Sequence, residues 1–160
     1  MNKSLRVWLL IAIASLVMLM CVCSFGRNTE QITFVPPEFD VAAQPGVPDI
    51  PDQWPYGTAQ LGEYELSLTT LVQLKDHDAY LYLANAPSND VWMKVRVFDA
   101  SENIIGESGL IKPNEYLEKV TLERMPKDSK IIVKVMCYEP DTYHSMGSSQ
   151  VTVATIKIPK

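Results

Sequence analysis

The chain has 160 residues and a net charge of −5, and both numbers limit what it can be. After an apolar N-terminus and a proline-rich stretch, about 100 residues remain, enough for one domain with a single core. Residues 61–160 carry 11 basic and 14 acidic residues. Because phosphate backbones require a basic surface, this acidic balance disfavours nucleic-acid binding, and we expect no nucleic-acid partner.

The first predicted element is the run from Val7 to Phe25, which contains no charged residue, proline or glycine. As a helix it would be about 28 Å long, close to the thickness of the hydrocarbon core of a bilayer. Lys3 and Arg6 precede it, and positive residues tend to stay in the cytoplasm. The sequence therefore predicts a transmembrane anchor within residues 1–26, with a cytoplasmic N-terminus and an extracytoplasmic C-terminal part.

Two alternatives to a retained anchor stay open. Ser24-Phe25-Gly26 has the small-x-small pattern of a signal-peptidase site, and cleavage there would make the protein secreted. Lipidation of Cys21 or Cys23 is the other alternative, although the residues before them do not match a lipoprotein signal.

Residues 27–61 are predicted to be an acidic spacer. Six of the 11 prolines lie between Pro36 and Pro55, and proline favours extended, semi-rigid chain. A proline-rich ligand for a groove-binding partner is the alternative, but no basic residue flanks the PxxP-like spacing. Phe34, Phe39 and Trp54 are unusual in a bare spacer, so part of the stretch is a candidate for packing on the domain.

Residues 62–160 show the alternation of apolar and polar residues that is typical of strands. In the clearest case, Met93, Val95 and Val97 alternate with Lys94 and Arg96. The expected strands are 65–74, 79–84, 91–99, 104–105, 117–123, 131–139 and 150–158, with an irregular crossing at 106–114 and a loop at 139–147.

Seven or eight short strands, with turn residues between them and no helical period, indicate an all-β domain. The expected fold is an antiparallel β-sandwich of the immunoglobulin-like or fibronectin-III-like kind. The Cys…Trp…Cys spacing of antibody domains is absent. The predicted organisation is therefore an anchor at 1–26, a spacer at 27–61 and a β-sandwich at 62–160.

The sequence contains no recognisable catalytic or cofactor motif. It has no G-x-S-x-G, G-x-G-x-x-G or P-loop run, and we predict neither an enzyme nor a cofactor or metal site. Asp76-His77-Asp78 is better explained as a solvated turn than as a metal site. Cys137 follows Val133 and Val135 on the inward face of its strand, where we expect an inert, buried thiol.

The stretches VWMKVRVFDASENIIGESGLIKPNEYLEKVTLE (91–123) and KIIVKVMCYEPDTY (130–143) resemble a group of small exported Firmicute proteins. These have an N-terminal anchor, an acidic proline-rich spacer and one Ig-like sandwich, and their function is largely unknown. The resemblance rests on strand alternation and on the turns at 112–115 and 138–140. It implies a location at the surface of a Gram-positive cell and implies no activity.

The outward face of two predicted strands is the candidate contact surface for a partner. Aromatic rings, Met and Arg are enriched in protein interfaces, and this face interleaves them with lysines. Another strand, a loop or part of the spacer could instead cover it. The candidate contacts there and in the loop that follows are Trp92, Arg96, Phe98, Met136, Tyr138, Tyr143 and His144.

The sequence therefore favours a single-pass, membrane-tethered interaction module that binds an unknown protein or envelope component and has no catalysis. One alternative is an accessory structural subunit of an envelope or conjugation-type assembly. Another is a carbohydrate-binding module, for which Trp92, Tyr80 and Tyr82 could supply an aromatic platform.

Overall fold

The structure is a computed structural model that describes residues 34–158. Contacts divide the chain into Met1–Val35 and Pro36–Lys160, and every described strand lies in the second unit. The predicted anchor at residues 7–25 and its cleavage site lie outside the described residues. Within residues 34–158 no helix is long and apolar enough to span a bilayer.

The described part of the chain is all-β, as predicted, and contains no helix. Its strands are β1 (Gln44–Pro45), β2 (Tyr56–Leu61), β3 (Tyr64–Thr69), β4 (Leu71–Lys75), β5 (Asp78–Asn85), β6 (Trp92–Phe98), β7 (Ile104–Ile111), β8 (Glu115–Thr121), β9 (Lys130–Tyr138) and β10 (Ser145–Lys157).

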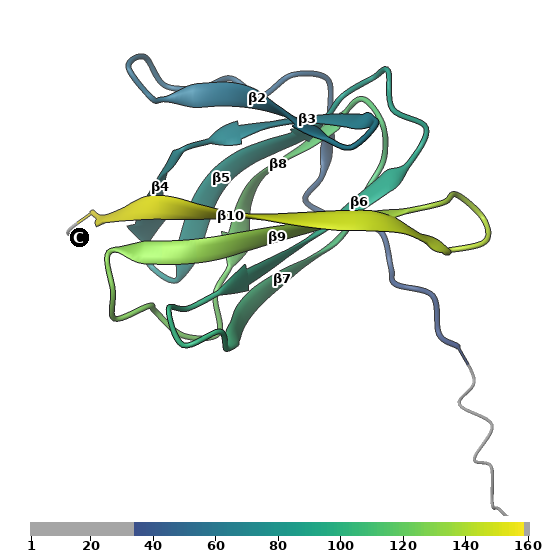
Figure 1. Cartoon of the computed structure of the whole chain (residues 1–160). Coiled ribbons are helices and arrows are strands. Elements are labelled where there is room, and N and C mark those ends of the chain that lie inside the picture. The colour runs from purple at the N-terminus through teal and green to yellow at the C-terminus, as the bar shows by residue number, and fades with distance from the viewer. Residues whose placement is uncertain (1–33, 159–160) are drawn as a thin grey trace, which may run out of the picture. The chain divides into compact units, whose positions relative to one another are not determined.

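The strands form one mixed sheet that curls around the core (Figure 1). Its order is β1-β8-β5-β4-β10-β9-β6-β7, and β3 joins β5 and carries β2 at its edge. All neighbouring pairs are antiparallel except β10 and β4, which pair in parallel from Ala154↔Leu71 to Lys157↔Leu74. The prediction of a purely antiparallel arrangement is therefore wrong at this one pair.

Alternating side chains of the long strands build the core as expected. Met93, Val95 and Val97 of β6 are fully buried, and they share one cluster with Ile131 and Val133 of β9. Leucines of β3, β4 and β5 complete that cluster from the other strands. The predicted inward face of β6 and β9 is confirmed, and Cys137 is buried there too.

The strands are more numerous than the sequence suggested. The single strand expected at 65–74 is divided at Thr70 into β3, which pairs with β5, and β4, which pairs with β5 and β10. Thr69 stabilises this division, because its buried hydroxyl donates to the carbonyl of Pro55 at 3.1 Å or of Leu71 at 2.9 Å. β10 is also longer than expected and begins within the predicted loop at 139–147.

The stretch expected to be an irregular crossing, 106–114, is mostly strand β7, although its register with β6 shifts at two places. Its glycines allow close approaches and do not break the strand. A Cβ on Gly106 would lie 2.9 Å from the carbonyl oxygen of Thr121, and one on Gly109 would lie 2.5 Å from the backbone nitrogen of Asp40. Glycine is therefore required where neighbouring chain passes this strand.

Much of the predicted spacer at 27–61 belongs to the strand unit, which begins at Pro36. Residues 38–46 form a segment that runs from β7 to β8. The amide of Leu110 donates to the carbonyl of Glu38 at 2.8 Å, and the amide of Asp40 donates to the carbonyl of Leu110 at 2.9 Å. Further on, β1 pairs with β8 through Gln44↔Tyr116. The segment thereby closes this side of the sheet.

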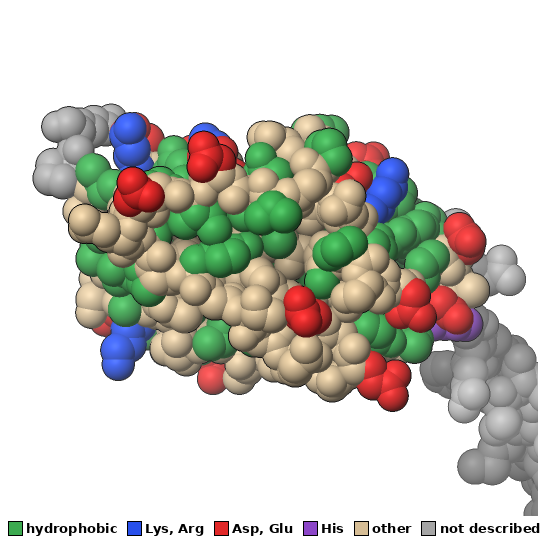
Figure 2. All heavy atoms as spheres, turned by 90° about the horizontal axis from the view of Figure 1, so that it is seen from above, with side chains coloured by type: hydrophobic (Ala, Val, Ile, Leu, Met, Phe, Trp, Pro, Cys, Tyr) green, Lys and Arg blue, Asp and Glu red, His purple; other side chains and the backbone are tan. Residues whose placement is uncertain are grey.

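The opposite side is closed only in part. β4 covers β10 from Ala154 to Lys157, whereas the preceding residues of β10 have no strand on that side within the described chain. An apolar groove of about 180 Å³, the edge groove, lies here between β2 and β3 on one side and β9 and β10 on the other. Figure 2 shows this side of the molecule from above, with hydrophobic side chains over much of it, Lys and Arg towards its margins and separate Asp and Glu side chains among them.

Candidate interaction surface

The candidate surface is the outward face of β6 and β9. The register places Trp92 opposite Tyr138, Lys94 opposite Met136, Arg96 opposite Lys134 and Phe98 opposite Ile132. Side chains of opposite residues on one face of a sheet lie about 5 Å apart. The structure thus brings together the five predicted contacts on these strands: Trp92, Arg96, Phe98, Met136 and Tyr138.

An aromatic cluster occupies the end of this face where β6 begins. The ring of Trp92 meets Phe39 edge-on at a centroid distance of 4.8 Å and meets Tyr143 at 5.3 Å. The ammonium group of Lys112 lies 4.5 Å above the ring of Phe39. Such edge and cation–π contacts add to the burial of the rings. Phe39 belongs to the stretch predicted to be a spacer, so part of that stretch covers part of the predicted contact surface.

A buried amide fixes the position of Trp92 at the start of β6. The side-chain nitrogen of Asn85 donates to the carbonyl of Val91 at 2.8 Å and to that of Ile111 at 3.1 Å. Asn89 donates to the oxygen of Asn85 at 2.7 Å, which completes the network. Because each of these buried groups is bonded, the ends of β5, β6 and β7 are held in one arrangement.

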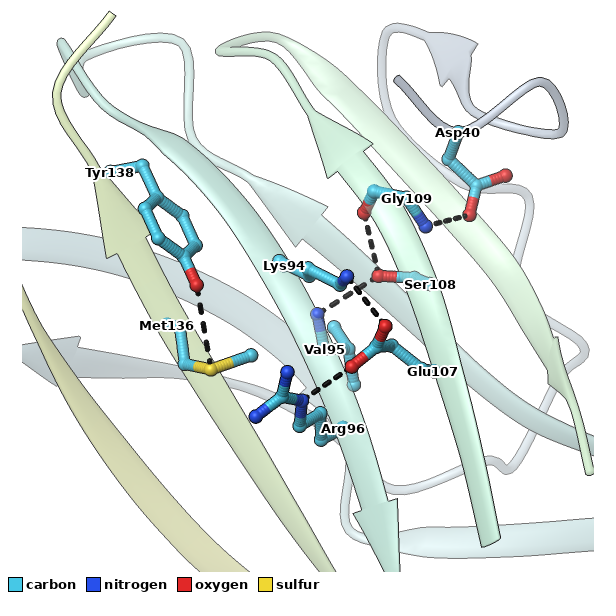
Figure 3. A network of polar contacts seen from close by, with 9 residues as sticks. All are labelled: Asp40, Lys94, Val95, Arg96, Glu107, Ser108, Gly109, Met136 and Tyr138. Carbon is cyan, nitrogen blue, oxygen red and sulfur yellow. Dashed lines mark hydrogen bonds and ion pairs between the residues drawn. The ribbon is translucent and has the colours of Figure 1, made fainter. Parts of the chain in front are cut away.

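The middle of the face is an ion-pair cluster that joins β6 to β7 (Figure 3). Lys94 donates to one carboxylate oxygen of Glu107 at 2.6 Å, and the Nε of Arg96 donates to the other. Partial burial acts to raise the pKa of Glu107, but the bonds and charges of Lys94 and Arg96 outweigh it and leave that pKa below its ordinary value. Glu107 therefore neutralises one of the two positive charges that the sequence places on β6.

Two further features complete the surface. The hydroxyl of Tyr138 donates to the sulfur of Met136 at 3.7 Å, and Met136 is only 8% exposed. A shallow recess of about 290 Å³ beyond Arg96 is lined by Phe98, Glu102, Ile132, Lys134 and Gln150. Phe98 and Tyr138 are thus accessible in part, whereas Met136 supports the face from within.

The loop at 139–144 holds the last two predicted contacts. Tyr143 packs on Trp92, as described, with φ at 58°. His144 is exposed, and its Nδ1 lies 3.5 Å from a carboxylate oxygen of Glu139. The amides of Glu139 and Tyr143 bond to the carbonyls of His144 and Glu139, which shapes the loop into a tight turn beside the sheet.

The aromatic platform considered for carbohydrate binding does not form. Tyr80 and Tyr82 are on β5, which does not pair with β6, the strand of Trp92. Tyr82 is only 6% exposed because Trp54 covers its ring at a centroid distance of 5.0 Å. Trp54 is the second aromatic residue of the predicted spacer that packs on the strands.

Few side chains among residues 34–158 are placed for metal binding or nucleophilic catalysis. Among residues 34–158 no three His, Cys, Asp or Glu side chains converge as metal ligands. Burial raises the pKa of the Cys137 thiol to about 11, so that thiol is protonated at neutral pH. His77 lies in the turn between β4 and β5, where its carbonyl accepts a bond from Leu122 at 2.6 Å.

Sequence reasoning missed Glu107, Lys112 and the role of Phe39 at this surface. The unusual aromatic residue in a proline-rich stretch was the one available signal for Phe39. Glu107 gave no signal, because it lies in the stretch expected to be irregular. Comparison of the chain with protein-family models and with curated proteins finds no match.

Proposed function

We propose that this chain is a membrane-tethered, extracytoplasmic interaction module of a bacterial cell envelope, without catalytic activity. Residues 7–25 anchor it, and the strand unit carries the contact surface. The outward face of β6 and β9 binds a protein or another envelope component.

We further propose that the curled sheet is an Ig-like β-sandwich. The strand order supports this, because β3-β5-β8 corresponds to strands A-B-E and β7-β6-β9-β10 to C′-C-F-G of such folds. β4, which pairs with strands of both groups, connects them at one side. The inter-sheet disulfide of antibody domains has no counterpart, since Cys137 is the one cysteine among the described residues.

The observation that carries the binding function is the composition of the β6–β9 face. Half-buried Trp92, Phe98 and Tyr138 lie on one face with Arg96 and Lys134. The ion pairs of Glu107 hold Lys94 and Arg96 in place. A rigid surface of aromatic and Arg side chains binds with little loss of conformational entropy. The exposed loop at 139–144 extends this surface, and sandwich loops often contribute to recognition.

Proximity labelling from a C-terminal fusion in intact cells tests the proposal. The double variant Phe98→Ser, Tyr138→Ser removes the two accessible rings, and we expect it to lower labelling of the main envelope partner by about tenfold. Val47→Ser is the matched control, because Val47 is 81% exposed and lies outside this face. Equal labelling by the parent and the double variant would contradict binding through the β6–β9 face.

The accessory structural subunit is the second candidate, and the uncharged free edge of β10 favours it. Sheet edges are natural sites for joining subunits. Replacing residues 1–26 by a foreign membrane anchor distinguishes the interaction module from the accessory subunit. An interaction module keeps its partner after the exchange, whereas a subunit whose own helix packs in an assembly loses it.

A further inference from the structure

The free edge of β10 is bounded at both ends. β4 begins to pair with β10 at Ala154, and the register with β9 shifts between Ser145 and Gly147. Residues Gly147–Val153 between these limits pair with β9 alone. They therefore offer a seven-residue strand edge within the described part of the chain.

The direction of the backbone groups on this edge follows from two hydrogen bonds near its end. The amide of Thr155 donates to Ser129, beside β9, and the amide of Ile158 donates to Leu74 of β4. Because N–H and C=O groups alternate sides along a strand, those of Ser148, Gln150 and Thr152 point to the free edge. Gln150 is the middle residue of this edge.

This edge lacks the usual protection against pairing. Natural edge strands carry lysine, proline or covering chain, and β7 is covered in this way by Glu38 and Asp40. Residues 145–153 contain no charge and no proline, and all residues from Ser145 to Thr152 are exposed. The side chain of Val151 is 42% exposed at the border of the edge groove.

A strand added beside β10 would also cover the apolar surface of the edge groove. Leu61, Leu66, Leu68 and Val135 line it, together with Val151, and none of its lining residues is charged. A strand beside β10 would direct alternate side chains into the groove. The added strand would thereby do for Gly147–Val153 what β4 does for Ala154–Lys157, which is to pair with β10 and cover the apolar surface beside it.

A second copy of the chain fits this edge by symmetry and charge. An interface about a two-fold axis brings the same patch onto itself, so a charged patch would repel its copy. Each strand unit is acidic, yet the edge and the groove are neutral. An antiparallel strand edge is complementary to itself, because each residue offers one donor and one acceptor.

We propose that two copies of this chain associate through antiparallel pairing of their β10 edges, with the two-fold axis at Gln150. Ser148 then bonds to Thr152 of the other copy, and Gln150 bonds to its own counterpart. Val151 of each copy lies over the mouth of the other's groove. The limits at Ala154 and Gly147 fix this register. If the second β10 were shifted along the edge in either direction, it would run into β4 or into the register shift before Gly147.

A cysteine scan of Gly147–Val153 in the full-length chain tests the register. Cys21→Ser, Cys23→Ser and Cys137→Ala first remove the native thiols, and a mild oxidant is then added to isolated membranes. Opposite residues have Cα atoms about 5 Å apart, within reach of a disulfide, whereas residues two positions from the axis do not. We therefore expect Gln150→Cys to give about tenfold more disulfide-linked dimer than Ser148→Cys or Thr152→Cys.

A second pair of variants tests whether the strand edge makes the contact. In the Gln150→Cys background, Thr152→Pro removes an amide that faces the free edge and keeps the pairing with β9. We expect it to lower the cross-linked dimer several-fold, whereas Thr152→Val, which keeps the amide, leaves it unchanged. Equal cross-linking at all seven positions, or none at any, would overturn the proposal, as would a dimer insensitive to Thr152→Pro.

Discussion

At the scale of single residues, Glu107 decides the character of the β6–β9 face. Its carboxylate accepts bonds from Lys94 and Arg96, and its side chain is 36% exposed. Without it, two cations would stand side by side on β6, which would repel each other. Glu107 therefore lowers the positive charge around the aromatic side chains and holds Lys94 and Arg96 in place.

This arrangement predicts a pH dependence of stability. The pKa of Glu107 is lowered in the folded chain, so its contribution is complete above its ordinary value of 4.5 and is lost as the pH falls through the folded value. We expect Glu107→Gln to lower the free energy of unfolding by about 1 kcal/mol or less at pH 7, since the pair is partly exposed. As the pH is lowered from 4.5 to 3, the difference in unfolding temperature between the parent and the variant should shrink.

Glu123→Gln is the control for this comparison, because Glu123 is exposed and makes no ion pair among those of the described residues. It should unfold like the parent at pH 7 and at pH 3. A difference between the parent and Glu107→Gln that persists undiminished at pH 3 would show that the carboxylate does not act through its charge.

At the scale of elements, the segment at 38–46 links the aromatic cluster to the closing of the sheet. The amide of Gly109 donates to a carboxylate oxygen of Asp40 at 2.8 Å, and the neighbouring Phe39 packs on Trp92. The segment thus holds one ring of the cluster in place and covers the edge of β7. Its attachment depends on close contact of two backbones at Gly109.

Gly109→Ala should therefore detach this segment. The added Cβ would lie 2.5 Å from the nitrogen of Asp40 and 2.8 Å from the carbonyl carbon of Phe39, which backbone atoms cannot accommodate. We expect a loss of about 1–3 kcal/mol in the free energy of unfolding, as for other overpacking changes, and faster proteolysis near Asp40. Gly57→Ala should change neither, because no atom lies within 4 Å of its added Cβ. Parent-like stability of Gly109→Ala would contradict the docking of this segment.

Periodicity predicted the elements that bury one face and expose the other. β5, β6 and β9 were predicted nearly to their ends, because aliphatic residues such as Leu81, Met93 and Val133 recur at every second position of the sequence there. Only the first two residues of β7 were predicted, since Gly106 and Gly109 suggest a break when the neighbouring chain that requires them is unknown. β1 and β2 were missed because they border the prolines, and their pairing partners are distant in sequence.

The candidate surface was predictable only where it belongs to a single strand. The outward direction of Trp92, Arg96 and Phe98 follows from the buried residues between them. The contact of Phe39 with Trp92 spans the predicted boundary between spacer and domain, and no local pattern reveals it. Met136 was expected to be accessible, but it is nearly buried against Tyr138.

At the scale of the whole molecule, the proposed tether and the proposed pairing of β10 support each other. Anchored copies share one membrane, and confinement raises their effective concentration, so a short strand pair suffices to associate them. The β6–β9 face borders the free edge of β10 and shares Gln150 with it, because Gln150 lines the recess beside Phe98 and Lys134. A dimer paired at this edge would accordingly place two β6–β9 faces next to each other.

The location of the strand unit tests the central claim most directly. Val41→Cys places a thiol at a fully exposed position, in a chain whose Cys21 and Cys23 are replaced by Ser. A membrane-impermeant maleimide is applied to intact cells, and the chain is followed through fractionation. The account predicts labelling without permeabilisation and recovery of the labelled chain with the membranes. Labelling only after permeabilisation, or a labelled chain found in the medium, would contradict a tethered extracytoplasmic module.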